Sequence, residues 1–313
     1  MSQGAGVEWS DEVDEILGGD LAVALAYLTP AKGVMISPMA PLGLRDHEAG
    51  TLTLTSSLAL WKKLDRIRRN PGVAVAYHTR DHALTDRPGF VLVQGRATFD
   101  PTPDREWLES ITPQWNKFLG ERSTGLMGRT QRVYYWERIA IEIRIERILH
   151  WRDTAATGEP EVFGSPVPPP PEPQKPPGKG SGPRVDVGKL AGSVNKLRHT
   201  LLGWCGSDDM PDVVPVSGAA EAPVGVRLSV PPGRVPPGGR RAGLTAHQFQ
   251  PKMLGQNQRI HSGWMENRGD EVIYAPHTRA GYALPNSKAL YLVACASLAT
   301  RMRASRRAGV APS

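Results

Sequence analysis

The chain has 313 residues and a mass of 34.0 kDa, enough for one large domain or two ordinary ones with apolar cores of their own. Hydrophobic residues make up 40% of the chain, and no apolar run approaches the ~18 residues of a membrane-spanning helix, so we expect no membrane partner. The first 15 residues are acidic and show no basic stretch followed by an apolar one. We therefore expect no signal peptide and a cytoplasmic protein.

Charge is distributed unevenly along the chain. Residues 1–163 carry 19 Lys and Arg against 22 Asp and Glu, net −3, whereas the remainder carries 19 against 9, net +10. A basic half can indicate a nucleic-acid partner, but no recognised binding motif accompanies the charge, so we expect none. Cys205 and Cys295 lie 90 positions apart without metal-ligand spacing, and no two histidines share ligand spacing on a predicted helix, so we expect no metal site.

The first part of the chain is predicted to consist mainly of strands. Apolar runs and period-two alternation indicate strands, and apolar residues at steps of three to four indicate helices. The predicted helices cover residues 12–17, 57–69 and 105–119, and the predicted strands cover residues 22–29, 33–39, 51–56, 73–78, 90–99 and 133–148. Many strands with one short crossover helix favour a closed or partly closed barrel.

A stretch rich in proline and glycine, residues 164–185, divides the chain. Proline cannot donate hydrogen bonds to a sheet and favours an extended conformation, so we interpret this stretch as a linker between domains at residues 1–163 and 186–313. The second domain shows short apolar runs at 213–216, 226–230, 244–247 and 272–274, and a predicted final helix at 287–307.

A weak internal repeat relates the two halves. Leu25, Tyr27 and Pro38 match residues 177 positions later, Leu54 matches Leu228, and Gly72 matches Gly243. In this alignment the predicted helix 57–69 falls opposite residues 231–239, whose prolines and glycines exclude a helix. The second half is therefore predicted to be a degenerate copy of the first.

The segment from Leu54 to Pro71 carries the clearest functional pattern. A strand ending in hydroxyl residues runs directly into a helix, which gathers free amide and hydroxyl donors at the positive end of the helix dipole. Lys62 or Lys63 adds a full charge one to two turns later. This pattern predicts an anion-binding cradle; a capped helix with a solvated basic face is the alternative, since Ser56 or Ser57 is a good cap with or without a ligand.

The ordered combination of these motifs resembles the pyridoxamine 5′-phosphate oxidase-like family. The resemblance rests on the hairpin ending in Ile36-Ser37-Pro38, the Thr-Ser-Ser strand end, the helix with Lys63, Ile67 and Pro71 at steps of four, and the strands from Val73 and Phe90, and it covers most of residues 20–152. It implies a mainly β, split β-barrel fold that binds flavin mononucleotide (FMN) or the deazaflavin coenzyme F420 where two barrels meet. In this chain the second barrel would be supplied in cis by the degenerate copy, or in trans by a homodimer.

The resemblance also implies site residues. Thr55, Ser56 and Lys63 would hold the cofactor phosphate, and Ile36, Ser37 and Pro38 would line its ring. Arg129 or Arg132 is a further candidate for contact with a phosphate or substrate.

These features predict an oxidoreductase that uses FMN or F420 on a small organic substrate. No nucleophile–base–acid motif occurs in the chain, which is typical of enzymes whose cofactor carries the chemistry. The alternative hypothesis is a non-catalytic split barrel that binds a cofactor or haem.

Overall fold

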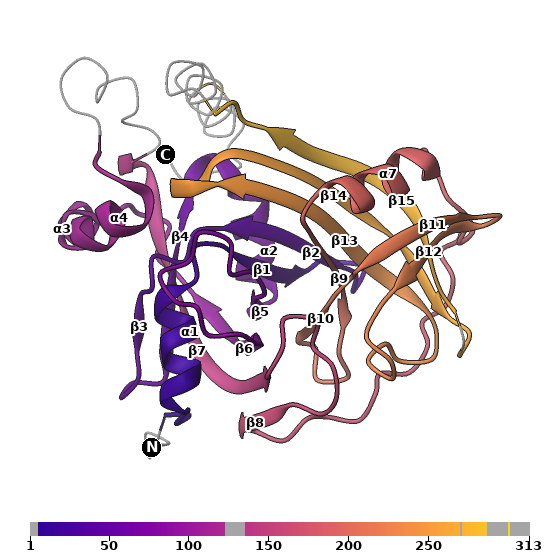
Figure 1. Ribbon diagram of the computed structural model, residues 1–313, viewed down its shortest axis with the longest axis horizontal. Coiled ribbons are helices and arrows are strands. Elements are labelled where there is room, and N and C mark those ends of the chain that lie inside the picture. The colour runs from indigo at the N-terminus through magenta and orange to yellow at the C-terminus, as the bar shows by residue number, and fades with distance from the viewer. Residues whose placement is uncertain (1–5, 123–134, 270, 287–299, 301–313) are drawn as a thin grey trace.

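The computed structural model describes residues 6–122, 135–269, 271–286 and 300. They form two curled antiparallel sheets, each with its own helices, joined by the proline-rich segment (Figure 1). The predicted Arg129 and Arg132, and all but residue 300 of the predicted final helix at 287–307, lie outside the described residues. Among the described residues, no helix combines the length and apolar character needed to cross a bilayer.

The first sheet has the strand order β2-β1-β5-β6-β7-β4-β3, with β8 paired to β7. Its strands are β1 (Val23–Leu28), β2 (Val34–Met39), β3 (Arg45–Asp46), β4 (Thr51–Ser57), β5 (Gly72–Tyr77), β6 (Phe90–Thr98), β7 (Arg138–Trp151) and β8 (Glu161–Gly164). Helix α1 (Asp11–Gly19) begins at the N-cap Ser10, whose hydroxyl accepts a bond from the Val13 amide. Helix α2 (Trp61–Arg69) follows β4 through a short 3-10 turn, η1 (Leu58–Leu60).

The helix predicted over 105–119 is broken in two. Helix α3 (Arg105–Ser110) ends before Ile111, and α4 (Thr112–Leu119) starts again with a proline in its first turn. Pro113 has no amide hydrogen and clashes with a preceding turn, so it is tolerated only at the start of a helix.

The second sheet repeats the first, with the order β10-β9-β13-β14-β15-β12-β11. Its elements are α7 (Val187–Lys196), β9 (His199–Cys205), β10 (Pro211–Pro215), β11 (Gly218–Ala222), β12 (Gly225–Ser229), β13 (Gly238–Gln250), η2 (Pro251–Met253), β14 (Leu254–Asn267) and β15 (Val272–Ala283). Position for position, β9 and β10 replace β1 and β2, and β12 to β15 replace β4 to β7. The fold is a tandem split β-barrel.

Strand register confirms most of the repeat and corrects one match. Leu25 pairs with Val75 in the first sheet, and its counterpart Leu202 pairs with Leu244 in the second, so the offset at these strands is 169. Gly243 therefore corresponds to Ala74, and the predicted match with Gly72 is wrong by two positions. As predicted, the connection between β12 and β13 contains no helix.

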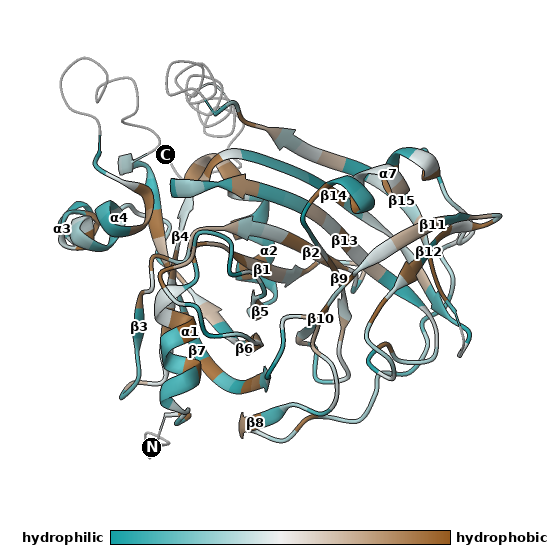
Figure 2. Ribbon diagram, viewed as in Figure 1, coloured by the Kyte–Doolittle hydropathy of each residue, from teal (hydrophilic) through white to brown (hydrophobic). Residues whose placement is uncertain are grey.

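Apolar cores fill each barrel and the space between them. One cluster packs α1 and α2 into the first barrel, and another packs α7 into the second. A third cluster joins the domains: Val34 and Ile36 of β2 meet Leu201, Cys205 and Val213 there. Figure 2 shows hydrophobic segments of β1 and β2 in the middle of the molecule. Burial of this interface holds the two barrels together.

Candidate functional site

The predicted anion cradle lies where β4 passes into α2. The Ser57 hydroxyl accepts a hydrogen bond from the Ala59 amide at 3.2 Å and so caps the 3-10 turn. Because Ser57 caps, Ser56 is not needed for that purpose. The Ser56 hydroxyl is buried and has no hydrogen-bond partner among the described residues. The two serines thus have separate roles, which the sequence left open.

Arg138, at the start of β7, binds Thr55. Its Nη2 donates to Thr55 Oγ1 at 2.7 Å and to the Thr55 carbonyl at 3.1 Å. The guanidinium also lies over the Trp115 ring, 5.3 Å from the centroid. Sequence reasoning missed Arg138. The register that places Arg138 opposite Ser57 is set by long-range pairing and leaves no local signal.

Lys63 is the buried member of the Lys62-Lys63 pair. It lies on the inner side of α2 and is 6% exposed, whereas Lys62 faces solvent. Among the described residues, no carboxylate forms an ion pair with Lys63. Burial and the neighbouring Arg138 lower the pKa of Lys63 to about 7. Two cations next to each other, one of them desolvated, favour a bound anion.

The geometry of β4 divides the predicted phosphate ligands. Successive side chains of a strand point to opposite faces, so Thr55 lies on the face of Arg138 while Ser56 lies on the face of Leu54, in the first barrel. Arg138 binds Thr55 and lies near enough to Lys63 to lower its pKa, whereas the unpaired Ser56 hydroxyl is on the other face of the strand. We call Thr55, Lys63 and Arg138 the cationic cradle; a phosphate fits its donors and charge.

The residues predicted to line the cofactor ring lie on β2, an edge strand of the first sheet, whereas the cationic cradle lies near the opposite edge, on β4 and β7. The Ile36 side chain is fully buried in the core between the domains, and its carbonyl oxygen accepts a bond from Thr245 Oγ1 at 2.9 Å. Ser37 points to the opposite face, with Met35 and Met39, and is half-buried. No hydrogen bond between described residues connects this segment to the cationic cradle.

A histidine cluster that the sequence did not predict lies between the domains. His78 Nε2 and His247 Nε2 are 2.7 Å apart, and both rings are buried. The strand register makes these two residues equivalent in the repeat, at the offset of 169. His78 Nδ1 contacts the Ala76 carbonyl at 3.0 Å, so it carries the hydrogen and His247 donates across the interface. Among the described residues, no group of three or more ligands has metal-binding geometry.

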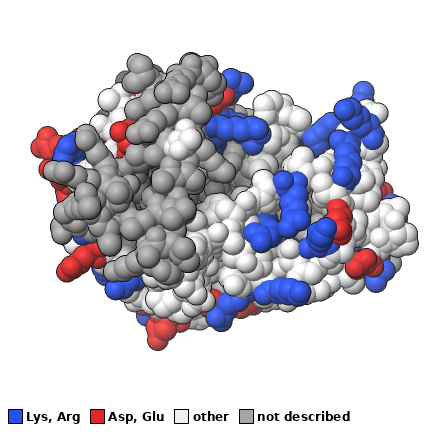
Figure 3. All heavy atoms as spheres, turned by 90° about the horizontal axis from the view of Figure 1, so that it is seen from above, with Lys and Arg blue, Asp and Glu red and all other residues white. Residues whose placement is uncertain are grey.

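Basic residues do not form a continuous stripe on the visible part of the face seen from above. Figure 3 shows Lys and Arg side chains there in several separate groups, with Asp and Glu near some of them.

Comparisons with known proteins give structural similarity only. No family model and no curated protein matches the chain. Similar solved structures include a conserved hypothetical protein from Mycobacterium tuberculosis, at 20% identity and TM-score 0.36, covering 49% of this chain and 90% of that one. A putative pyridoxamine 5′-phosphate oxidase from Listeria innocua has 20% identity and TM-score 0.33, covering 46% and 98%.

A third similar structure is an F420 reductase, at 16% identity and TM-score 0.31, covering 43% of this chain and 94% of that one. Each of the three spans about half of the present chain, the length of one barrel. Of the three, the Listeria innocua protein carries in its name the family that the sequence resembles. At these identities the likeness concerns the fold.

Proposed function

We propose that this protein is an oxidoreductase that binds FMN or F420 and acts on a small organic substrate. The observation that carries the proposal is Lys63, a buried ammonium next to Arg138 with no carboxylate partner among the described residues. A phosphate group supplies the anion that this site lacks. When bound, the cofactor ring would accept or donate a hydride.

In this proposal the chain binds and orients the cofactor. Lys63 and Arg138 hold the phosphate by charge, and Thr55 donates its hydroxyl hydrogen to it; the unpaired Ser56 hydroxyl lies on the opposite face of β4 and takes no part. The segment of residues 36–38 provides the wall for the ring. Within it Ser37 is the residue whose side chain points away from the interdomain core.

The second domain, in cis, takes the place of a second subunit. Its strands β13 and β14 pack against β2, where the ring wall lies. Its own β12–β13 connection lacks both the helix and the lysine of the first copy. We therefore expect one cofactor for each chain.

The test is a fluorescence titration of the purified protein with FMN and with F420, in parallel, using Lys63→Ala and Lys62→Ala. The two lysines are neighbours on α2, but only Lys63 is buried, so Lys62→Ala is the matched control. We expect one cofactor to bind, Lys63→Ala to weaken it by about tenfold or more, and Lys62→Ala to change affinity by less than about twofold. Failure of both cofactors to bind would refute the proposal.

Catalysis needs a separate readout. Reduction of the bound cofactor by a hydride source, followed by reoxidation by an acceptor, would support an oxidoreductase. A tightly bound cofactor that passes no electrons would instead identify a non-catalytic binder.

A further inference from the structure

A proline strap, residues 166–171 of the linker, is bound to both domains. Arg147 Nη1 donates to the Pro166 carbonyl at 2.8 Å, Ser207 Oγ to Pro169 at 2.7 Å, and Arg240 Nη1 to Pro171 at 3.0 Å. Proline has no amide hydrogen, so the strap can lie against the protein with few donors to satisfy. The contacts fix an extended segment in place.

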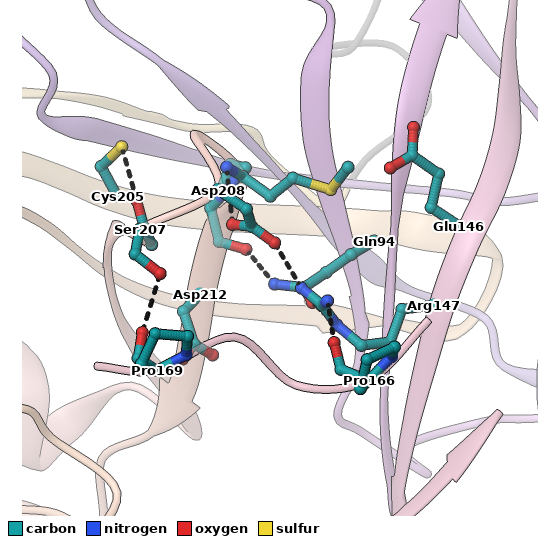
Figure 4. Close-up of polar contacts among 12 residues, drawn as sticks. Gln94, Glu146, Arg147, Pro166, Pro169, Cys205, Ser207, Asp208 and Asp212 are labelled. Atoms are coloured by element: carbon teal, nitrogen blue, oxygen red, sulfur yellow. Dashed lines mark hydrogen bonds and ion pairs between the residues drawn. The ribbon is translucent and has the colours of Figure 1, made fainter. Parts of the chain in front are cut away.

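A cavity of about 200 Å³ lies beneath this strap, between the two domains. Leu149 of the first domain, Trp204 of the second and residues 233–237 of the β12–β13 connection line it together with the strap. Figure 4 shows Arg147 bound to the strap at Pro166 and Ser207 bound to it at Pro169, with Asp208 and Asp212 on the same side of the strap between them. The volume is well above the ~10–15 Å³ needed by one water molecule, so a small organic molecule has room.

Two of the four charged residues that line the cavity, Arg147 and Asp208, are already paired. Arg147 Nε donates to Gln94 Oε1 at 2.7 Å, and its Nη2 donates to Asp208 Oδ2 at 2.8 Å. With the bond to Pro166, each nitrogen of this guanidinium has a partner. Arg147 and Asp208 therefore build the wall and are not free to bind a ligand.

Arg234 and Asp212, the other two charged residues of the cavity, are not joined to each other by an ion pair. Arg234 stacks over the Trp151 ring at 4.4 Å; its Nε is buried without a partner, and no described residue accepts a hydrogen bond from its guanidinium. Stacking holds the guanidinium plane while its N–H edge stays available.

Asp212 is the opposite charge in the same cavity. Its Oδ1 accepts a bond from the Val213 amide at 2.9 Å, whereas Oδ2 has no hydrogen-bond partner among the described residues. Burial raises the pKa of this carboxyl, and Arg234 and Arg147 oppose that rise, so the group lies near both guanidiniums but is poorly solvated. Asp212 and Arg234 are nevertheless more than 4.0 Å apart, since no ion pair joins them.

We propose that this cavity binds a small zwitterion, an α-amino acid or a molecule with the same head group. Its carboxylate would bind Arg234, its ammonium would bind Asp212, and its apolar side chain would contact Trp204, Leu149 and the prolines of the strap. A separated pair of opposite charges is complementary to a ligand that carries both charges close together. A simple anion would leave Asp212 unpaired, and a simple cation would leave Arg234 unpaired.

The proposed site is independent of the cofactor proposal. It uses none of Thr55, Ser56, Lys63 or Arg138, and one wall is the β12–β13 connection, the counterpart of the segment that carries α2 in the first copy. Loss of the helix in the second copy thus removed a basic element and left a coil that lines this cavity.

Three probes that share a phenylethyl group test the assignment. L-Phenylalanine carries both charges, phenethylamine only the ammonium and 3-phenylpropionate only the carboxylate. Isothermal titration with the full chain is expected to show binding of L-phenylalanine or, for a smaller side chain, L-leucine, with each singly charged analogue about tenfold weaker or more.

Two variants separate the contacts. Asp212→Asn should weaken L-phenylalanine but leave 3-phenylpropionate unchanged, and Arg234→Gln should weaken L-phenylalanine but leave phenethylamine unchanged. Arg268→Gln, which alters an exposed arginine of the second domain, is the control and should bind like the parent. Circular dichroism before titration checks that each variant is folded. No binding of either amino acid at about 10 mM to the parent chain, or equal binding of all three probes, would overturn the proposal.

Discussion

Lys63 is a buried cation without a carboxylate partner among the described residues, so its charge destabilises the fold; in the proposed function the same charge binds the cofactor phosphate. The unfolded chain keeps an ordinary lysine, whereas the folded chain lowers the pKa of Lys63 to about 7. Between those two values the unfolded state binds more protons at this group, so its contribution to the free energy of unfolding falls as pH decreases from about 10.5 to 7 and is constant below.

Lys63→Met should therefore stabilise the ligand-free protein. Methionine keeps the length and apolar stem of lysine without the charge, so we expect a higher free energy of unfolding, by a few kcal/mol or less on the scale of about 1.4 kcal/mol per pKa unit. The gain should be larger at pH 7 than at pH 9. Urea denaturation of both proteins at the two pH values measures it; a destabilised variant at pH 7 would show that Lys63 has a structural partner.

Cofactor binding should in turn depend on pH through the same group. A phosphate stabilises the charged lysine and raises its pKa, so binding above pH 7 requires uptake of a proton. We expect affinity to be constant below about pH 7 and to fall by up to tenfold per pH unit above it. Titrations between pH 6 and pH 9 in the parent and in Lys63→Met test this, since the variant should lose the pH dependence along with most of its affinity.

At the scale of elements, both sheets bend at the same place. The register shifts between Gln94 and Gly95 in β6 and between Ser262 and Gly263 in β14, which are equivalent positions of the repeat. A Cβ at either glycine would lie 2.2 Å from a backbone carbonyl oxygen, of Arg144 or of Ala275. A bulge with glycine increases local twist and curls the sheet.

Gly95→Ala and Gly263→Ala should each destabilise the chain by about 1–3 kcal/mol, because the clash is with backbone rather than with a flexible side chain. Gly178→Ala in the linker meets nothing within 4 Å and is the matched control, expected to be neutral or slightly stabilising. Thermal unfolding followed by circular dichroism compares the three. Equal melting temperatures for all three variants would mean that the neighbouring strands move to accept the added methyl group without loss of stability. The bulges would then not determine the curvature of the sheets.

Local patterns explain which elements could be predicted. The strands near residues 23–28, 34–39 and 51–57 alternate or are fully apolar, so their own residues specify them. The succession of a strand, a hydroxyl run and a helix predicted a lysine here but left Lys62 and Lys63 open, and only the family resemblance pointed to Lys63. Arg138 was not predictable, because strand pairing across the sheet places it opposite Ser57; nor were Arg234 and Asp212, because the packing of distant segments brings them to one cavity. The missed break at Ile111 was local, and Pro113 is its signal.

At the scale of the whole molecule, one hydrogen bond joins equivalent residues of the two copies. A contact between His78 and His247 requires an approximate twofold axis between the barrels, since only there do equivalent atoms meet. Burial and the neighbouring His199 lower the pKa of His78 to about 3. The folded pKa lies below the ordinary value of 6.5, so stability is lost as pH falls from about 6.5 toward 3.

Acid should therefore weaken the interface between the domains, and His78→Gln should reduce that sensitivity. Glutamine keeps a hydrogen-bonding group at the axis but does not titrate. We expect the variant to be less stable than the parent at pH 7.5 and to lose less stability between pH 7.5 and pH 4.5. Urea denaturation of the parent and the variant at the two pH values measures how much free energy of unfolding each protein loses. An equal loss in both would mean that groups other than His78 cause the acid sensitivity.

The helix-free β12–β13 connection has a consequence for how the two halves could change over time. In an assembly of two identical chains, every substitution appears twice, so one half-site cannot be altered while the other is kept. Here each half is encoded separately, and the first copy kept its lysine helix while the second exchanged it for a coil. The single chain can therefore carry two different sites at one interface between the barrels. An assembly of two identical chains could not, because both of its half-sites would have the same residues.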